Sequence, residues 1–412
     1  MTTKNVWILN HYAISPDLPG GTRHYDLSKE LVKRGLDVTI FASGFEHSSK
    51  RYIKISPREK RKIETYNGVR FVWLNTYPYY GNNWRRVVNM LSYGIRVLGA
   101  CKGLNRPDAI IGSSLHPFAV LAAWLLSKRY KARFIFEVRD LWPQTAVDMG
   151  AMKETSLMAR LLYAWEKFMY KKAEKIIVLL PNAKEYITKL GIDAEKICWI
   201  PNGVDLERFD HPEPLEKDSE AAKAFSQHQD KVKVVYTGAH GPANGLEVVI
   251  DAAVILSKQK KPVHFFLVGD GPEKTKLIEK AEIMGINNVS FLKPVPKAQI
   301  SSLLQQADIL LHCLRPLNVF KYGLSPNKLF DYLASGKVII MSAQESNEII
   351  ERSNSGISVD PGNPDALAKG ILQIMQVDPV QREQYGINGR EYVERYHSIE
   401  ALGEKLYSIL ES

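Results

Sequence analysis

Short apolar runs alternate with longer amphipathic stretches along nearly the whole chain. Thirteen runs have the length and composition of β-strands, and they lie at residues 6–10, 38–42, 69–74, 109–113, 134–138, 176–180, 198–201, 233–237, 264–268, 289–292, 309–313, 338–341 and 357–359. Helical patterns lie between them, for instance at residues 21–34, 117–128, 157–172 and 182–190. Strands and helices that alternate in this way build parallel sheets covered by helices on both faces. The sequence therefore predicts an α/β fold with two doubly wound, Rossmann-like domains.

The 412 residues are enough for two such domains. The polar stretch 206–230 holds few apolar residues and is interpreted as the crossing point between them. We expect a first domain at residues 1–203, a second at 204–387, and a C-terminal helix at about residues 388–412 that packs back on the first. Ligands of doubly wound sheets bind beyond the carboxyl ends of the strands. The two domains are therefore expected to face each other across a cleft that holds the site.

The composition is that of a globular protein, with 45% apolar and 24% charged residues. Three cysteines cannot form a disulfide framework and are not closely spaced as metal ligands, which favours a reducing compartment. The N-terminal segment is interpreted as a first strand rather than a signal peptide. The longest apolar run, at about residues 119–126, is far shorter than the roughly 20 residues of a spanning helix.

Positive charge is concentrated in the first half of the chain. Residues 1–200 hold 32 Lys and Arg against 17 Asp and Glu, whereas residues 201–412 hold 23 against 28. A basic stretch at 49–62 precedes a segment at 76–99 with apolar residues near helical spacing, which suggests docking on an anionic membrane. The residues expected to face that membrane are Lys50, Arg51, Lys60, Arg61, Lys62, Trp84, Arg85 and Arg86. The alternative is a core helix behind a solvated basic loop; nucleic acid is disfavoured because no nucleic-acid motif accompanies the charge.

Two loops of the first array end apolar strands with residues suited to a ligand. Gly20 and Gly21 allow a sharp turn and a close approach of the backbone to a ligand, although they also fit a plain turn. His116 follows a strand and precedes a helix opened by Pro117. It is placed to donate to a substrate oxygen, unless it bonds to nearby backbone.

A third loop follows the strand at 134–138 and carries three charged residues. These are Glu137, Arg139 and Asp140, and their charges at the end of an apolar strand are costly unless they pair or meet a polar ligand. Arg139 and Asp140 are therefore candidates for the acceptor side of the site. The alternative is a purely structural ion pair.

The loop at 236–245 in the second array holds three glycines between a strand and a helix. Small residues there admit an anion to backbone N–H donors, as in a phosphate-binding turn. Gly238 is the candidate phosphate-loop glycine and His240 could add a donor. The spacing matches neither the Rossmann nor the Walker A pattern.

The stretch at 314–336 contains the candidate for the nucleotide site. Ser325 is predicted to cap a helix that has Pro326 at its first position, followed by Asn327 and Lys328. The free N–H groups of this helix start can bind a diphosphate, and Lys328 adds charge. Asp331 lies one turn on and could accept two ribose hydroxyls. The alternative is a capped helix with an exposed aspartate.

Taken together, these segments resemble the family-4 glycosyltransferases of the GT-B architecture. The resemblance covers nearly the whole chain and rests on the motifs PGG at 19–21, SSLHP at 113–117, EVRDLWP at 137–143, IPNGVD at 200–205, YTGAHGPANGLE at 236–247, VGDGPE at 268–273 and GLSPNKLFDYLASGK at 323–337. It implies a retaining enzyme that uses a nucleotide-diphosphate sugar and requires no metal. The similar bacterial branch adds sugars, often amino sugars, to lipid-linked intermediates of O-antigen, capsule or exopolysaccharide.

The resemblance also implies roles for individual residues. Asp331 matches the acid that holds the ribose, and Ser325 and Lys328 match the phosphate-binding helix start. Gly20 and Gly21 match the loop that approaches donor and acceptor, His116 matches a histidine that contacts the donor sugar, and Gly238 matches the phosphate-loop glycine. His116 and Lys328 are therefore the expected catalytic residues.

The chain departs from the family pattern at four positions. Gly323 stands where a sugar-binding Glu is usual, Ala239 and Asn244 replace the usual Arg and Lys, and Val338 replaces a Pro. These changes shift the role of balancing the diphosphate charge toward Lys328, Arg315 or Lys321.

The expected function is transfer of a sugar from a UDP-sugar to a polyprenyl-diphosphate-linked glycan, at the inner face of the cytoplasmic membrane. The expected partners are the donor, this acceptor and an anionic membrane surface, with no nucleic acid and no metal or other cofactor. Two alternatives remain at this point. One is a nucleotide-sugar 2-epimerase of the same fold, and the other is a non-catalytic sugar-binding subunit.

Overall fold

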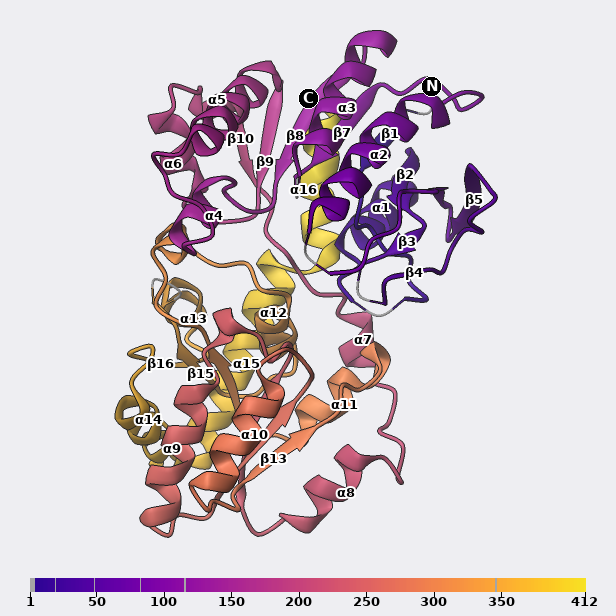
Figure 1. The fold of residues 1–412 in the computed structure, drawn as a ribbon. Helices are drawn as coiled ribbons and strands as arrows, with labels where there is room; N and C mark the ends of the chain where they lie inside the picture. Colours follow the sequence, from indigo (N-terminus) through magenta and orange to yellow (C-terminus); the bar gives the residue numbers. More distant parts are fainter. Residues whose placement is uncertain (1–3, 19, 48, 82, 115, 345–346) are drawn as a thin grey trace. The chain divides into compact units, whose positions relative to one another are not determined.

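The computed structural model describes residues 4–18, 20–47, 49–81, 83–114, 116–344 and 347–412 (Figure 1). The chain divides into two compact units. The first comprises Met1–Pro201 with Ile399–Ser412, and the second comprises Asn202–Ser398. Each unit is a layered α/β structure, as the alternation of strands and helices predicts.

The first unit is built on an eight-stranded sheet. Its strands, in spatial order, are β10 (Ile197–Trp199), β9 (Lys175–Val178), β8 (Arg133–Val138), β7 (Ala109–Ser113), β1 (Asn5–Leu9), β2 (Asp37–Ser43), β6 (Val69–Leu74) and β5 (Arg61–Tyr66). Neighbouring strands run parallel, except that β5 pairs antiparallel with β6. A separate two-stranded ribbon pairs β3 (Phe45–Glu46) with β4 (Arg51–Tyr52). The basic stretch at 49–62 thus contains β4 and the beginning of β5.

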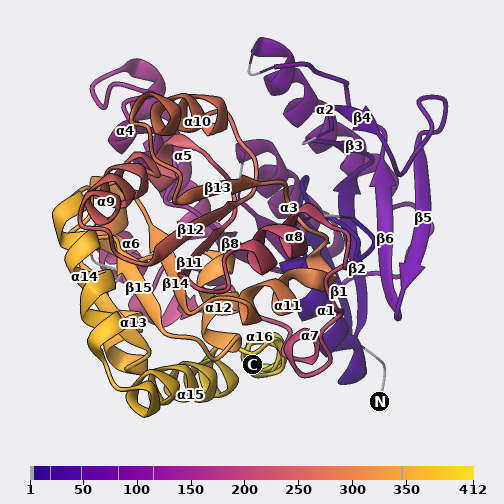
Figure 2. The same ribbon diagram turned by 90° about the horizontal axis from the view of Figure 1, so that it is seen from below.

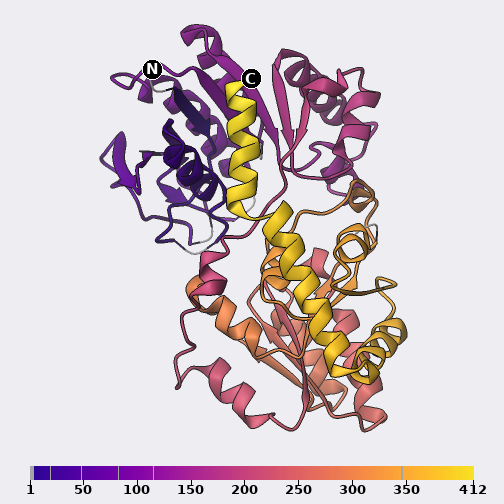
Figure 3. The same ribbon diagram turned by 180° about the vertical axis from the view of Figure 1, so that it is seen from behind.

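Helices cover both faces of this sheet. On one face lie α1 (Arg23–Lys33) and α16 (Ile399–Glu411), which Figure 3 shows side by side. On the other face lie α2 (Trp84–Ala100), α3 (Pro117–Tyr130) and α5 (Leu157–Lys172), with α3 next to both of the others. Shorter helices complete the unit, namely α4 (Gln144–Asp148), α6 (Ala183–Lys189) and the 3-10 turn η1 (Ala194–Lys196).

The second unit is built on a six-stranded sheet in which every pairing is parallel. Its strands, in spatial order, are β13 (Val289–Leu292), β12 (Val263–Val268), β11 (Val232–Thr237), β14 (Ile309–Cys313), β15 (Ile339–Ser342) and β16 (Gly356–Val359). All residues of β12 and β14 are buried, because helices cover both sides of the sheet.

Two apolar clusters hold helices on the two faces of the second sheet (Figure 2). One face carries α9 (Glu247–Lys258), α10 (Lys274–Ile283) and α14 (Pro364–Gln376). The other carries α8 (Glu220–Gln227), α11 (Ile300–Gln305), α12 (Asn327–Ala334), α13 (Asn347–Ser353) and α15 (Pro379–Tyr396). The remaining helical turns are α7 (Glu207–Asp210), η2 (Pro242–Asn244), η3 (Lys297–Gln299) and η4 (Asn318–Tyr322).

The fold class is thus confirmed, and the boundaries differ in detail. The chain crosses into the second unit after Pro201, so the polar stretch at 206–230 lies inside that unit. Ala221 and Phe225 of α8 pack into its core, which explains why this polar segment is ordered. The chain returns at 399 rather than near 388, because α15 packs on α12. Among the described residues, no helix is both long and apolar enough to cross a bilayer.

Candidate functional site

The carboxyl edge of the second sheet brings together the two loops that the sequence singled out there. Gly238 directly follows β11, and Lys328 lies in the first turn of α12. A Cβ atom built on Gly238 would lie 3.0 Å from Nζ of Lys328, so the ammonium group touches the glycine loop. The predicted phosphate-loop glycine and the predicted phosphate-binding lysine therefore belong to one site.

The Lys328 side chain is held by two neighbours in the same unit. Its Nζ atom donates to Tyr236 Oη at 2.6 Å and to Asn244 Oδ1 at 3.0 Å, and it lies 4.2 Å from the centre of the Tyr236 ring. Burial lowers the pKa of Lys328 to about 8. An ammonium group whose pKa is lowered by desolvation is stabilised when an anion arrives beside it. The site is therefore suited to a phosphate-bearing ligand.

The start of α12 differs from its prediction in one respect. Pro326 is the N-cap and carries no side-chain cap, and Ser325 is not the capping residue. Ser325 Oγ instead accepts from the backbone N–H of Asn202 at 2.7 Å, and its carbonyl accepts from the Asn202 side chain at 2.6 Å. Because no side chain caps the helix, the first-turn N–H donors of Asn327 and Lys328 are not used by a capping residue.

Two glycine loops pass very close to each other at this edge. Gly238 has φ +133°, and Gly269, at the end of β12, has φ +153°. A Cβ atom on Gly269 would lie 1.9 Å from the Gly238 carbonyl oxygen, so no larger residue fits without moving backbone. The close approach fixes the position of the Gly238 loop beneath Lys328.

Asp331 lies one turn after Lys328 on α12 and is partly exposed. Its Oδ1 atom is 3.4 Å from the guanidinium of Arg208, which the sequence did not single out. Arg208 belongs to α7, inside the polar stretch that the sequence pattern assigns to a crossing point. Asp331 thus keeps a partly exposed carboxylate one helical turn from Lys328.

His240 is placed differently from its prediction. The residue is fully buried, and neither ring nitrogen has a hydrogen-bond partner in the described part of the chain. Burial, followed by repulsion from Lys274, lowers the pKa of His240 to about 4, so the ring is neutral near pH 7. A fully buried ring does not present a donor to a ligand in this structure.

His116 lines the carboxyl edge of the first sheet and caps α3. Its Nδ1 atom accepts from the Ala119 N–H at 3.3 Å, and its Nε2 atom is 2.8 Å from Nδ1 of His11. Burial, followed by repulsion from Arg86, lowers the pKa of His116 to about 3, so the ring is neutral. A neutral ring with Nδ1 as acceptor carries its proton on Nε2 and donates it to His11. Both nitrogens are thus engaged, and the expected donation to a substrate requires one of these bonds to break.

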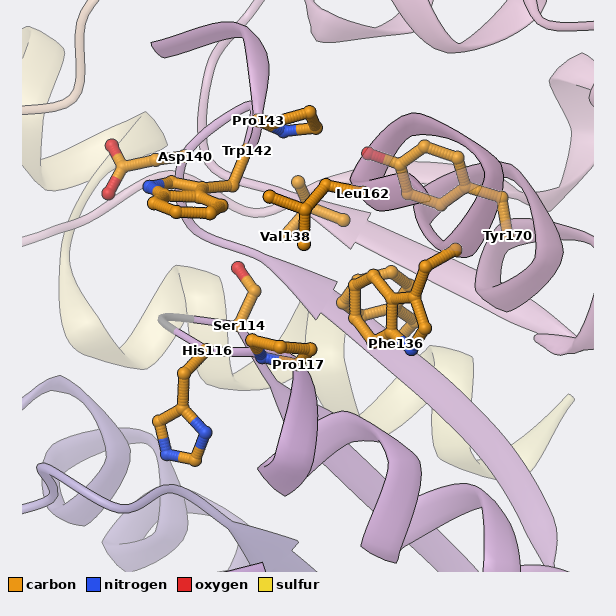
Figure 4. A pocket seen from close by; sticks show the side chains of 11 residues that line it. Ser114, His116, Pro117, Phe136, Val138, Asp140, Trp142, Pro143, Leu162 and Tyr170 are labelled. Atoms are coloured by element: carbon orange, nitrogen blue, oxygen red, sulfur yellow. The ribbon is translucent and has the colours of Figure 1, made fainter. Parts of the chain in front are cut away.

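A narrow hollow lies beside His116 (Figure 4). Its wall contains apolar side chains from β8 and α5, including Phe136, Val138, Leu162 and Trp165. Asp140 lies at the rim, exposed, next to Trp142. The hollow holds only about 20 Å³, so it presents apolar side chains and one carboxylate but is too small for a sugar ring.

The other first-unit candidates lie around this edge. The Arg139 N–H donates to Ser114 Oγ at 2.9 Å, and its guanidinium helps to keep the pKa of Glu137 low. Gly20 has φ +124°, which a residue with a side chain rarely adopts, and Gly21 is exposed beside it. Pro19 of the same motif lies outside the described residues.

Comparisons with known proteins show which family the chain belongs to. Residues 20–208 match the model "Glycosyltransferase Family 4", and residues 231–377 match "Glycosyl transferases group 1". A curated relative, the putative colanic acid biosynthesis glycosyl transferase WcaI of Escherichia coli (strain K12), is 25% identical over 297 residues, 70% of either chain. The chain is a glycosyltransferase of the GT-B fold. The probable glycosyltransferase WbjE of Pseudomonas aeruginosa is 22% identical over 66% of this chain and 67% of its own.

Solved structures share the fold of this glycosyltransferase over its whole length. Sucrose-phosphate synthase of Thermosynechococcus elongatus has a TM-score of 0.74 and 18% identity, over 99% of this chain and 98% of that one. HepE of Anabaena, in complex with UDP and glucose, has a TM-score of 0.68 and 18% identity, with both chains covered completely. The family models and relatives do not favour the epimerase or the non-catalytic subunit.

One departure from the family pattern in this glycosyltransferase, Asn244, is directly connected to Lys328. Asn244, where a Lys is usual, accepts a hydrogen bond from Lys328 and donates one to the Ala239 carbonyl at 2.9 Å. The other two cations considered for the diphosphate are used differently. Arg315 lies 3.5 Å from Glu273, and Lys321 is exposed over the Tyr322 ring. Arg315 also touches the other end of the glycine loop, near Gly245, whereas Lys328 is the cation whose ammonium group reaches Gly238.

The predicted membrane-facing residues of the glycosyltransferase separate into two groups. Six of them are exposed, namely Arg51, Lys60, Arg61, Lys62, Trp84 and Arg85. The other two are half-buried: Lys50 donates to the His47 carbonyl, and Arg86 bonds to Tyr12 near His116. The prediction that Arg86 faces outward is thus wrong, because α2 turns it toward the histidines.

The outer surface of the helix layer of α2, α3 and α5 is unusually apolar. On α2, Trp84 and Ile95 are 66% and 62% exposed, and on α5, Leu157 is 73% exposed. Further exposed apolar side chains of this layer are Val87, Leu91, Leu125, Met158, Leu161 and Phe168. Exposed apolar side chains gathered on one helix layer are typical of a surface that binds a partner protein or a membrane. The sequence pointed to the α2 part and missed the α5 part.

Proposed function

We propose that the glycosyltransferase takes its sugar from a nucleotide diphosphate, most simply UDP, bound at the carboxyl edge of the second sheet. The observation that carries this is the contact of the Lys328 ammonium with the Gly238 loop at the uncapped start of α12. N–H donors, a helix start and one half-buried cation form a set that suits a diphosphate. The complex of HepE with UDP and glucose supports the choice of nucleotide.

We propose that the acceptor is a glycan on a polyprenyl diphosphate, in the synthesis of a surface polysaccharide such as O-antigen, capsule or exopolysaccharide. The names of relatives support this, since WcaI is named for colanic acid biosynthesis. The acceptor would bind at this edge of the first sheet, outside the narrow hollow beside His116, where Arg139 and Asp140 follow β8. The apolar layer of α2 and α5 supports work at the inner face of the cytoplasmic membrane.

In the proposed reaction, the donor C1–O bond breaks, the diphosphate leaves with the electron pair, and an acceptor hydroxyl forms the new bond on the same face. The proton of that hydroxyl passes to the leaving phosphate. Lys328 and the N–H groups of α12 stabilise the charge that develops on the diphosphate, which is where most of the rate gain arises. We propose that these groups make a divalent metal unnecessary, that configuration is retained, and that the sugar is an amino sugar.

A direct assay tests the proposed function. The purified enzyme is incubated with a panel of UDP-sugars and a short polyprenyl-diphosphate glycan, with and without EDTA, and released UDP and the product anomer are measured. We expect one donor to be used, EDTA to have no effect and the product to keep the donor's configuration. Failure with every donor, an absolute metal requirement or an inverted product would each contradict the corresponding part of the proposal.

Replacing Asp331 tests the ribose role. We expect Asp331→Ala to weaken UDP binding by about 10- to 100-fold, because a charged acceptor of ribose hydroxyls is lost. Inorganic diphosphate lacks a ribose, so its affinity should stay unchanged in the same variant. Calorimetry with the two ligands measures both effects. Equal losses for UDP and diphosphate would assign Asp331 to the phosphate end or to the fold.

The lowered pKa of Lys328 predicts how UDP binding depends on pH. Below about pH 8 the side chain is charged in the free enzyme, and above that value it loses its proton. A bound diphosphate favours the charged form, so UDP binding above pH 8 takes up a proton and weakens by at most about tenfold per pH unit. Calorimetry in buffers of different ionisation enthalpy measures the uptake. Binding without proton uptake at pH 9 would contradict the contact between Lys328 and the diphosphate.

A further inference from the structure

A second hollow lies at the opposite edge of the first sheet, away from the carboxyl ends of the strands. Its volume is about 480 Å³, and its wall is formed where α3 and α5 end and β8 begins. Six cationic side chains line it, namely Lys128, Lys131, Arg133, Lys171, Lys172 and Lys196. His116, at the start of α3, is separated from the hollow by the 14 residues of that helix, a length of about 20 Å. The hollow is therefore separate from the proposed catalytic edge.

The positive charge of this basic hollow is only partly balanced. Glu174 is the acidic residue in its wall, and Arg133 already pairs with it at 2.6 Å. Lys196 donates to the Ala173 carbonyl at 2.9 Å. The other four lysines, at 128, 131, 171 and 172, have no carboxylate partner within the described residues.

Helix dipoles do not account for the excess either. The hollow receives the C-terminal ends of α3 and α5, and Arg133 also donates to the last carbonyls of α16. Each helix end is equivalent to about half a negative charge. Three such ends and Glu174 offset about 2.5 of the six positive charges, which leaves an excess of roughly three to four around the hollow. A cavity with this excess is suited to an anion with more than one charged or polar oxygen.

Exposed apolar side chains border the same hollow. Phe168 is 41% exposed, its ring lies 5.5 Å from that of Trp124, and Lys172 Nζ lies 5.2 Å from its centre. Leu125, which follows the lining residue Trp124 on α3, is also 41% exposed. Leu157, Leu161 and Phe168 follow one stripe of α5 that ends at the basic hollow. The cations that line the hollow and the exposed apolar side chains near it match the two parts of a phospholipid.

We propose that this basic hollow binds the phosphate headgroup of an anionic membrane phospholipid, with the acyl chains lying against Phe168, Leu125 and the stripe on α5. The inference rests on the proposed work at a membrane and names the lipid class and the place where it binds. A free phosphate would gain nothing from the apolar rim, whereas a lipid uses both parts. The lipid would fix the first unit on the membrane through the ends of α3 and α5 as well as through α2.

The test compares charge-neutralised variants in vesicle flotation. Vesicles contain phosphatidylcholine alone or equal parts of phosphatidylcholine and phosphatidylglycerol, and the full-length enzyme is used. We expect binding to the mixed vesicles only, and a loss of roughly 100-fold in affinity for Lys128→Gln/Lys131→Gln/Lys171→Gln. The matched control is Lys258→Gln/Lys260→Gln/Lys261→Gln, three exposed lysines of the second unit, with less than about threefold effect.

Two further measurements separate the hollow from general attraction. Phe168→Ser should weaken binding to the mixed vesicles by about tenfold, because the buried apolar area is lost while the charge stays. Trp124 should be quenched by brominated phosphatidylglycerol, and the Trp124→Phe variant should lack that share of the quenching. Soluble glycerophosphoglycerol at the same phosphate concentration should not release the enzyme.

Several outcomes would overturn the inference. Equal losses of vesicle affinity in the hollow and control variants would mean that binding depends on overall positive charge and not on the hollow. Release of the enzyme by the soluble headgroup would mean that the hollow binds free phosphate. Binding of an acidic polysaccharide that depends on the hollow lysines, with vesicle binding intact, would assign it to a polysaccharide. If α2 variants lose the vesicles and hollow variants do not, the membrane proposal stands and this inference fails. UDP binding, measured in parallel, should be unchanged in every hollow variant.

Discussion

Replacing Lys328 with Met is expected to abolish most of the activity without unfolding the enzyme. The variant should lose roughly 100- to 1000-fold in kcat/KM, which is typical for removing one donor that stabilises charge in a transition state. Affinities for UDP and for inorganic diphosphate should fall together, because both lose the same ammonium group. The UDP-release assay and calorimetry measure these changes.

The same substitution should leave the fold at least as stable as before. Holding a charged Lys328 beneath Tyr236 costs free energy, since burial lowers its pKa from 10.5 to about 8. That cost is on the order of 1–3 kcal/mol, and Met removes it while filling a similar volume. Lys321→Met is the matched control, because Lys321 is exposed near the same helix and makes no contact with the Gly238 loop. A large loss in the Lys321 variant and a small one in the Lys328 variant would reverse the assignment.

Much of the fold could be read from the sequence because most strands are buried on both faces. The predicted ranges 69–74, 109–113, 289–292 and 309–313 coincide with β6, β7, β13 and β14. Apolar runs of this length are typical of strands in a covered sheet, and β13 follows the pattern although it forms an edge of its sheet. The strand β5 was missed for the opposite reason. Its sequence RKIETY is largely exposed, and it is a strand because it pairs with β6 and because Glu64 accepts from the Trp73 indole at 2.8 Å.

The candidate site was only half predictable, for a similar reason. Residue types and positions at strand ends are local, so Gly238, Lys328 and Asp331 could be proposed one by one. Their partners come from distant parts of the chain: Tyr236 and Asn244 hold Lys328, and Arg208 faces Asp331. Whether a histidine has a free ring nitrogen is likewise decided by packing. His116 was predicted to donate to a substrate, but its Nε2 atom is hydrogen-bonded to His11. Sequence spacing cannot reveal contacts of this kind.

The largest expected effect on stability comes from Glu137, a residue of the third strand-end loop. Its carboxylate is buried and accepts from Arg23 Nε at 3.1 Å and from His24 Nε2 at 2.6 Å. The positive charges around it hold the pKa of Glu137 well below its usual value despite burial. Removing one partner of a buried ion pair leaves the other charge buried without a counter-charge. Glu137→Gln should therefore lower the free energy of unfolding by about 3–5 kcal/mol. Urea unfolding at pH 7 measures the loss.

The consequence of this loss reaches beyond the ion pair itself. Arg23 also donates to the carbonyls of Ile200, at 2.8 Å, and of Pro201. These are the last residues of the first unit before the chain crosses at Asn202. An Arg23 without its carboxylate would leave them without a fixed donor. We therefore expect proteolysis near residue 201 to be faster in the Glu137→Gln variant than in the wild type.

Glu166 provides the matched comparison, because it is a second buried carboxylate of the same unit in a neutral setting. Its oxygens accept from Tyr170 and Tyr186, and burial raises its pKa to about 7. Because the pKa of Glu166 is raised, its contribution makes the free energy of unfolding fall as pH rises from about 4.5 to 7. The lowered pKa of Glu137 has the opposite effect. It contributes stability that is present above about pH 4.5 and lost in acid. Glu166→Gln should therefore match or exceed the wild type at pH 8, while Glu137→Gln should approach it only in acid. Similar losses in both variants at pH 8 would mean that side-chain shape, and not charge pairing, determines the effect.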